Sequence, residues 1–316
     1  MPLVSVVIPT YNGSAWIAET LDSVFQQTLS QSKTEVIVVD DGSTDDTLEA
    51  IAPYRDRLRL IQQENMGVGA ARNRGIEAAN GRYVAPLDHD DLWKPRKLEV
   101  QVDFMETRSE CVGCTVPWAV STSPEEPVFD PSVLCDASNI IPHPIRKHWS
   151  SCFWRSSFGL MRREAIEDLQ YGTRRDCTED REFELRLFAR GAIGVAGQSV
   201  LGIYRSHDSN TSGNHDYSVR GTRRLRALDR SGYFDELNGS QRADLRFFLA
   251  QRSRSVLINL LRHGERKKAF RLYVDEAADL LRSHVRLFAA AFPGFLLAPF
   301  RWVRWYWPSG GPLHDE

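Results

Sequence analysis

The regular alternation of strand-length apolar runs with helix-length amphipathic segments is the feature that most constrains the fold of this chain. Apolar runs and helical patterns alternate in the order 3–8, 15–28, 36–39, 45–53, 58–61, 68–79 and 83–87. Short β-branched runs that are separated by helices predict a mostly parallel sheet covered on both faces. The sequence therefore predicts an α/β fold, whose ligands bind at the carboxyl ends of the strands.

The pattern changes twice further along the chain. Residues 108–160 are rich in proline and predict little regular structure. A helix is expected at 179–190 and one or two strands at 192–204, and from about residue 217 only Arg- and Leu-rich helical patterns follow. We therefore expect a nucleotide-binding and catalytic domain over 1–212 and a helical region over 213–316.

The charge of the chain is unevenly distributed. The formal net charge is −2, which argues against a general nucleic-acid binder. Residues 1–200 carry 21 Lys and Arg against 30 Asp and Glu, whereas the remainder carries 19 against 12. The basic C-terminal third suits an anionic partner such as a membrane surface.

The cysteines and the N-terminus both favour a cytoplasmic location of the protein. Five cysteines are too few and too odd in number for a secreted disulfide framework. Cys111 and Cys114 form a C-x-x-C motif, but no second pair follows to complete a zinc ribbon, so buried thiols are the simpler interpretation. The N-terminus opens as a strand and lacks the charged region of a signal peptide.

Turn-forming and polar residues follow each of the first four predicted strands. The segments are PTYN at 9–12, DDGSTD at 40–45, NMGVGAARN at 65–73 and LDHDD at 87–91. Because the carboxyl ends of parallel strands share one edge of the sheet, we expect these four loops to form one site.

Three aspartates in the fourth loop indicate a divalent cation. Asp88, Asp90 and Asp91 repel one another unless a positive charge lies between them, and Mg²⁺ or Mn²⁺ prefers such oxygen ligands. The alternative is that Asp90 and Asp91 cap a helix that begins near Lys94. The three neighbouring loops favour the metal site.

The glycines of the third loop do not form a dinucleotide fingerprint. Gly67 and Gly69 precede a helix, but the third fingerprint position holds Arg72, and the loop does not follow the first strand. A P-loop lysine motif is also missing from the sequence. Gly67 instead suits a close approach of the backbone to a ligand.

Taken in order, these segments resemble the family 2 glycosyltransferases of the GT-A fold. The resemblance covers about residues 1–210 and rests on SVVIPTYN at 5–12, VVDDGSTD at 38–45, Asn65 and Gly67 with ARN at 71–73, LDHDD at 87–91, GLMRRE at 159–164, ED at 179–180 and YRSH at 204–207. It implies a Rossmann-like sheet and an inverting transfer from a nucleotide-diphosphate sugar, with uracil the usual base.

The resemblance also implies a role for individual residues. Those implied to bind the nucleotide sugar are Pro9, Thr10, Tyr11, Asp40, Gly67, Arg72, Asp88 and His89. Asp90 and His207 would hold Mn²⁺ or Mg²⁺, and Asp180 would be the catalytic base with Glu179 as the second candidate. From its position alone, Asp180 is equally an acidic residue in the first turn of a helix.

Two departures from the family pattern concern the acceptor and the metal. The family often has a small residue where this chain has His89, which could add a ligand or point away. The family commonly has Gly-Gly-Phe-Asp before the base, where residues 170–175 read QYGTRR. The acceptor therefore does not follow from the resemblance.

Two aromatic segments lie outside these motifs. Residues 143–157 mix aromatic and basic side chains, which suits either an acceptor-binding loop or a buried apolar loop. In residues 282–307 the longest uncharged stretch, 287–300, is shorter than the roughly 20 residues needed to span a bilayer. Aromatic residues beside arginines are typical of membrane-surface elements, and packing on the catalytic domain or on a second subunit is the alternative.

The sequence thus predicts a metal-dependent glycosyltransferase that moves a sugar to a hydroxyl of a glycan or lipid-linked acceptor at the inner face of the cell membrane. Such a hydroxyl is a poor nucleophile and needs a carboxylate to take its proton. The alternatives are a nucleotidyltransferase and a non-catalytic nucleotide-sugar-binding or scaffold protein of the same fold. Retention of Asp88, Asp90 and Asp180 together speaks against the non-catalytic alternative.

Overall fold

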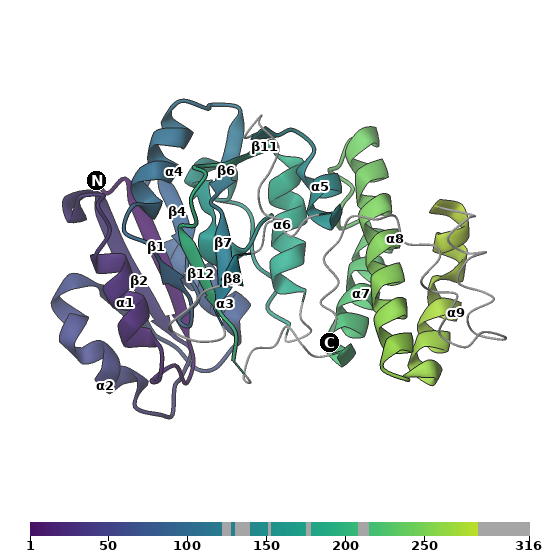
Figure 1. Ribbon diagram of the computed structural model, residues 1–316, viewed down its shortest axis with the longest axis horizontal. Helices are drawn as coiled ribbons and strands as arrows, with labels where there is room; N and C mark the ends of the chain where they lie inside the picture. The colour runs from purple at the N-terminus through teal and green to yellow at the C-terminus, as the bar shows by residue number, and fades with distance from the viewer. Residues whose placement is uncertain (122–127, 130–139, 151–152, 175–177, 208–214, 284–316) are drawn as a thin grey trace. The chain divides into compact units, whose positions relative to one another are not determined.

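The computed structural model describes residues 1–121, 128–129, 140–150, 153–174, 178–207 and 215–283. The chain forms two compact units, Met1–Asn210 and Thr211–Glu316 (Figure 1). Each unit is described by itself below.

The first unit is built on an eight-stranded sheet. Its strand order is β3 (Arg59–Gln62), β2 (Thr34–Asp40), β1 (Val4–Thr10), β4 (Tyr83–Pro86), β10 (Leu160–Arg162), β6 (Cys111–Thr115), β11 (Ala192–Val195) and β9 (Ile140–Ile141). The pairs β3–β2, β2–β1, β1–β4 and β6–β11 are parallel, whereas β10 and β9 run antiparallel to their neighbours. The prediction of a mostly parallel α/β sheet is confirmed.

Helices cover both faces of this sheet because successive strand residues point to opposite sides (Figure 1). Val4, Val6 and Ile8 of β1 share one buried cluster with residues of α1 (Ile17–Phe25), α2 (Thr47–Ile51) and α4 (Lys97–Glu106). Helix α3 (Val68–Ala78) lies on the opposite face, where a Cβ atom on Gly75 would overlap Val7. Glycine is therefore needed at position 75 to bring this helix close to β1.

A second sheet of four short strands was not predicted. It consists of β5 (Leu92–Trp93), β12 (Gly202–Arg205), β7 (Trp118–Ser121) and β8 (Val128–Phe129). Of its strands, only β12 overlaps a segment expected as a strand, at 192–204; β7 and β8 lie in the proline-rich stretch, and β5 has only two residues. Their pairing matters for the site, because β5 directly follows the aspartate loop and pairs antiparallel with β12.

The remaining elements of the first unit are short, apart from one helix. They are η1 (Gln31–Lys33), η2 (Ala52–Arg57), α5 (Pro144–Ser150), η4 (Ser156–Phe158), η5 (Arg163–Ala165) and α6 (Glu179–Ala189). Phe153 and Trp154 are buried, and both rings contact Phe188 of α6. For these two aromatic residues the buried-loop alternative is therefore correct.

Two of the five cysteines can be placed. Cys111 and Cys114 of β6 are buried and free, and the other three fall outside the described residues. Burial raises the pKa of the Cys111 thiol to about 11. These two thiols therefore belong to the core.

The second unit is helical throughout its described residues. It contains α7 (His215–Arg230), α8 (Gly239–Arg262) and α9 (Arg266–Ser283). Asn238 and Gln241 form a capping box at the start of α8, and apolar residues of the three helices share one buried cluster. The aromatic segment at 282–307 lies outside the described residues from position 284 onward.

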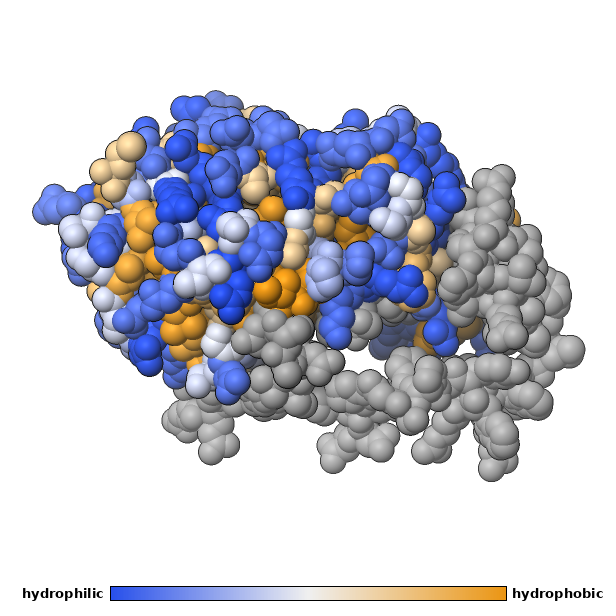
Figure 2. Space-filling view, turned by 90° about the horizontal axis from the view of Figure 1, so that it is seen from above, coloured by the Kyte–Doolittle hydropathy of each residue, from blue (hydrophilic) through white to orange (hydrophobic). Residues whose placement is uncertain are grey.

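Among the described residues, few large apolar side chains are exposed. On the face shown in Figure 2, apolar side chains lie between hydrophilic ones. The large apolar residues of the first unit that are exposed, among those described, are Met1, Tyr11, Met66 and Val68. In the described part of the chain, no helix combines the length and the apolar character needed to cross a bilayer.

Candidate active site

The loops that follow β1 and β2 are fastened to each other. The backbone N–H of Asn12 donates to Ser43 Oγ at 2.9 Å, and the Asn12 side chain accepts from the Thr44 N–H at 2.8 Å. Asn12 has a φ of 50°, a left-handed conformation that asparagine tolerates better than most residues. This exchange of hydrogen bonds holds the two loops at one edge of the sheet.

Asp41 connects the β2 loop to the start of α3. Its carboxylate accepts hydrogen bonds from the backbone N–H groups of Met66 at 2.9 Å and Gly67 at 2.7 Å. Gly67 has a φ of 95°, which favours glycine because other side chains are strained there. The predicted importance of Gly67 thus has a local structural cause, and the role of Asp41 was missed.

The residues assigned to the nucleotide lie at the ends of β1 and β2 and on the segments beside them. Thr10 and Asp40 are register partners at the ends of β1 and β2, and both are buried. Tyr11, Met66 and Val68 are exposed on the adjoining segments. Three of the four exposed large apolar side chains described in the first unit therefore lie just after β1 or around the start of α3.

Arg72 lies at the centre of an ion-pair network. Its guanidinium, only 4 % exposed, pairs with Asp88 at 2.6 Å and also with Asp180. Asp88 and Asp180 keep 35 % and 44 % of their side-chain exposure. One buried cation therefore joins the loop after β4 to the first turn of α6.

The pKa values of the two carboxylates in this network shift in opposite directions. For Asp88, burial acts to raise the pKa, but the charge and hydrogen bond of Arg72 outweigh it and hold the pKa below the usual range. For Asp180, partial loss of hydration outweighs the opposing charge of Arg72 although the side chain is half-exposed, so the pKa lies above its usual value. A raised pKa makes Asp180 the better proton acceptor of the two.

The aspartate loop gathers oxygen atoms suited to a cation. Carboxylate oxygens of Asp88, Asp90 and Asp91 lie within 4.8 Å of one another, and among the described residues they form the one such group. Burial, followed by the charges of Asp90 and Asp88, raises the pKa of Asp91 well above its usual value. A bound divalent cation would relieve this repulsion, so the residues fit Mg²⁺ or Mn²⁺.

The end of β12 and the two residues after it form the edge of this cluster. His207 Nε2 lies 3.1 Å from Asp90 Oδ2, and its ring stacks on Trp16 with centroids 5.0 Å apart. Arg205 donates to the backbone oxygen of Asp90, and its own N–H donates to Asp91 at 3.2 Å. The structure thus brings His207 to Asp90 across more than a hundred residues of sequence, as the resemblance implied.

Of the remaining predicted residues, Pro9 is buried in β1, and His89 and Glu179 lie on other sides of the site. A Cβ atom on Gly13 would lie 2.7 Å from the His89 ring, so that ring faces the loop after β1. Glu179 lies against helix α3, where its Cβ would be 3.4 Å from a Cβ on Gly69. Asp180, and not Glu179, is the candidate base that pairs with Arg72.

Three residues that contribute to the site were not predicted as functional. They are Trp16, Tyr171 and Arg205. Each acts through a contact with an element far away in the sequence. Of the three, only Arg205 belongs to a motif that carries the resemblance, YRSH at 204–207.

Sequence comparison confirms the resemblance to the family 2 glycosyltransferases. The model of glycosyl transferase family 2 matches residues 5–169. The putative teichuronic acid biosynthesis glycosyltransferase TuaG of Bacillus subtilis is 46 % identical over 112 residues, covering 34 % of this chain and 44 % of TuaG. Chondroitin synthase of Escherichia coli is 40 % identical over 106 residues, covering 33 % of this chain and 15 % of the synthase. The chain thus spans less than half the length of these relatives.

Solved structures share the fold at low sequence identity. S. aureus TarS 1–349 in complex with UDP-GlcNAc has a TM-score of 0.62 at 17 % identity, with 92 % of each chain covered. The mannosyltransferase PcManGT from Pyrobaculum calidifontis, in complex with GDP-Man and Mn²⁺, has a TM-score of 0.53 at 21 % identity, with 93 % of this chain and 87 % of that one covered. At these identities the similarity concerns the fold.

Proposed function

The chain belongs to glycosyl transferase family 2, and we propose that it transfers a sugar, with inversion, from a nucleotide-diphosphate sugar to an acceptor hydroxyl. The donor is UDP-linked and the acceptor is a glycan or a lipid-linked saccharide of cell-surface polysaccharide synthesis. The reaction takes place in the domain predicted at 1–212, because every assigned residue lies there.

The observation that carries this proposal is the bridge made by Arg72. It pairs with Asp88, assigned to the donor, and with Asp180, assigned to the acceptor. A transferase needs a base for one substrate close to the groups that hold the other. Here the buried Arg72 side chain keeps the two carboxylates close together.

Asp180 would take the proton from the attacking hydroxyl. Its carboxylate is 44 % exposed, so an acceptor can reach it, while Arg72 fixes its orientation. The attack occurs on the face of the sugar opposite the nucleoside diphosphate, which gives inversion. Because the pKa of Asp180 is raised, the carboxylate gains basicity.

Asp90, with Asp88, Asp91 and His207 around it, would hold the divalent cation. When bound, the cation neutralises charge that develops on the leaving diphosphate. The Mn²⁺ complex of PcManGT, which has the same fold, supports this assignment. His89 faces the nucleotide side of the site and would contact the donor.

Asp40 and the loops around it would bind the nucleoside. Asp40 is a buried acceptor at the end of β2, and the exposed Tyr11, Met66 and Val68 offer apolar surface beside it. The UDP-GlcNAc complex of TarS supports a UDP-linked donor, and the names of TuaG and chondroitin synthase support a polysaccharide acceptor.

A donor screen tests the proposal. UDP-, GDP- and dTDP-sugars are compared for thermal stabilisation of the protein and for sugar release, each with and without Mn²⁺. We expect stabilisation and release with UDP-sugars that depend on Mn²⁺. Equal effects in the absence of any metal would contradict the metal assignment, and no stabilisation by any nucleotide sugar would contradict the proposed function.

A further inference from the structure

We propose that Asn73 and Tyr171 form a clamp that positions the base, so that Asn73 is a positioning residue for transfer. This inference rests on the role proposed above for Asp180. It explains how a carboxylate on α6 is held against an arginine on α3, more than a hundred residues away in sequence.

The clamp begins with two hydrogen bonds between one side chain and one backbone unit. Asn73 Nδ2 donates to the Tyr171 carbonyl oxygen at 3.0 Å, and the Tyr171 N–H donates to Asn73 Oδ1 at 2.7 Å. The Asn73 amide both donates to and accepts from the backbone of one residue, as a neighbouring β-strand would. The segment at Tyr171 is thereby fixed to the residue next to Arg72.

The Tyr171 ring then fills the space between the two helices. It stacks on Phe183 of α6 with centroids 4.0 Å apart and an angle of 3° between the planes. The Arg72 guanidinium lies 5.2 Å from the centre of the same ring. Since Tyr171 and Phe183 are 2 % and 1 % exposed, this stack is a fixed spacer between Arg72 and the helix that carries Asp180.

The backbones beside the clamp approach each other closely. A Cβ atom on Gly69 would overlap the carbonyl oxygen of Gly172. Gly172 in turn lies against α6, where an added Cβ would be 3.1 Å from a carboxylate oxygen of Glu182. The segment therefore has no space to move inward in either direction.

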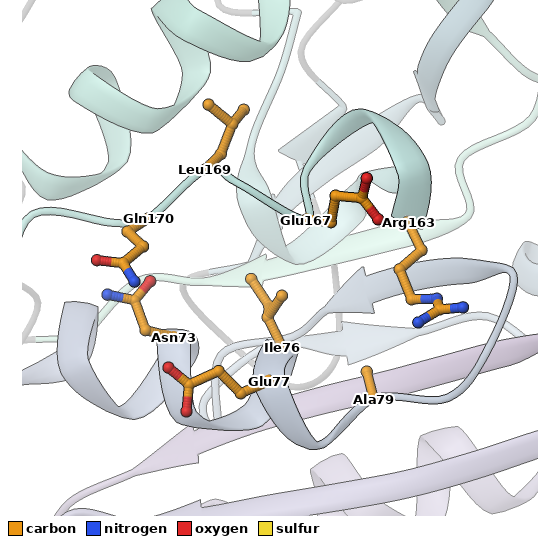
Figure 3. A pocket seen from close by; sticks show the side chains of 8 residues that line it. All are labelled: Asn73, Ile76, Glu77, Ala79, Arg163, Glu167, Leu169 and Gln170. Atoms are coloured by element: carbon orange, nitrogen blue, oxygen red, sulfur yellow. The ribbon is translucent and has the colours of Figure 1, made fainter.

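On its outer side, the segment borders a pocket. Figure 3 shows Asn73 reaching from α3 to the segment at Gln170, at one end of a pocket lined also by Ile76, Glu77 and Leu169. The Tyr171 ring is held by packing on Phe183, whereas the Tyr171 backbone is tied to α3 by the Asn73 amide. Both contacts keep Tyr171 beside Arg72.

The consequence is a specific effect on turnover. Without the Asn73 amide the Tyr171 ring can shift, and the first turn of α6 shifts with it. A displacement of about 1 Å at a reacting group can cost about a hundredfold in rate. Asp40, assigned to the nucleoside, lies at the end of β2 and outside the Asn73–Tyr171 contacts, so nucleotide binding should change much less than turnover.

The test compares wild type with Asn73→Ala, Asn73→Asp and the control Glu77→Gln. Glu77 lies on the same helix and is exposed, with one surface ion pair to Arg74. For each protein we would measure kcat for sugar transfer or hydrolysis, UDP affinity by calorimetry, and hydrogen exchange of peptides covering 170–174 and 178–183.

Asn73→Ala should lower kcat by about 10- to 100-fold, keep the UDP affinity within about twofold, and speed exchange in both peptides. Asn73→Asp, which cannot donate to the Tyr171 oxygen, should behave similarly, and Glu77→Gln should match wild type. Unchanged kcat and exchange in Asn73→Ala would overturn the inference, as would an equal loss of kcat and UDP affinity. A wild type that turns over no donor would instead contradict the proposed function, and the exchange data would still decide whether Asn73 holds α6.

Discussion

Replacing Arg72 by Met should destabilise the first unit by an amount that can be worked out from its two ion pairs. The guanidinium is 4 % exposed and pairs with Asp88 and Asp180. Methionine fills similar space without charge, so the two carboxylates would be left facing each other without a cation. Removing one partner of a buried pair is costly because the remaining charge stays uncompensated.

Solvent screening limits the size of this effect. Two unit charges 4 Å apart interact by about 4 kcal/mol at an effective dielectric constant of 20. Asp88 and Asp180 are 35 % and 44 % exposed, so each pair should contribute only about 1 to 1.5 kcal/mol. The loss for Arg72→Met is then about 2 to 3 kcal/mol.

A double-mutant cycle measures each pair. Urea unfolding at pH 7, followed by tryptophan fluorescence, would be recorded for Arg72→Met, Asp180→Asn and the double variant, and likewise with Asp88→Asn. We expect a coupling energy of about 1 kcal/mol or more in each cycle. Because Arg72 outweighs burial and lowers the pKa of Asp88, the contribution of that pair is present above the usual carboxyl pKa and disappears as the pH falls through the lower folded value.

Arg74→Met provides the matched control. Arg74 lies on the same helix, is 60 % exposed, and pairs with Glu77 at 3.6 Å. Its replacement should change stability by less than about 0.5 kcal/mol. Coupling energies near zero for both Arg72 pairs, or an equal loss in Arg74→Met, would refute the reasoning.

Three further predictions concern other parts of the site and the core. Trp16→Ala should weaken Mn²⁺ binding about 10- to 100-fold, measured from the free Mn²⁺ signal by electron paramagnetic resonance, because the ring orients His207; Trp16→Phe should retain most of the affinity. Gly69→Ala should lower the melting temperature, since its Cβ would overlap the carbonyl oxygen of Gly172, and an unchanged value would show that the loop can give way. Cys111, with a pKa raised by burial to about 11, has about one thiolate in a thousand at pH 8, so peptide mapping after iodoacetamide should find it unlabelled in the native protein and labelled in urea.

The part of the fold that depends on local pattern could be predicted from the sequence. The four parallel strands have short apolar runs that alternate with helical patterns, and the structure contains these strands and helices within a few residues of the predicted bounds. The small second sheet could not be predicted, because β7 and β8 lie in a proline-rich stretch and β5 has only two residues. Its pairing of β5 with β12 depends on contacts distant in sequence.

The candidate site, too, could be predicted only where it depends on local motifs. Asp88, Asp90 and Asp180 were found from motifs, and their roles remain predictions. The bridge that Arg72 makes between two of them could not be inferred, because it joins residues 108 positions apart. Tyr171 was missed for the same reason, since a lone tyrosine in a polar segment gives no sign of its partners on α3 and α6.

The most direct test of the proposed mechanism is the effect of Asp180→Asn on turnover and on donor binding, measured on one preparation. Asparagine can still accept the Arg72 hydrogen bond but cannot take a proton, so kcat should fall about 10²- to 10⁴-fold while UDP affinity stays within about threefold. In wild type, kcat should decline as the pH falls through the raised pKa of Asp180, because the base must be ionised. Turnover of Asp180→Asn within tenfold of wild type would contradict the assignment of Asp180 as the base.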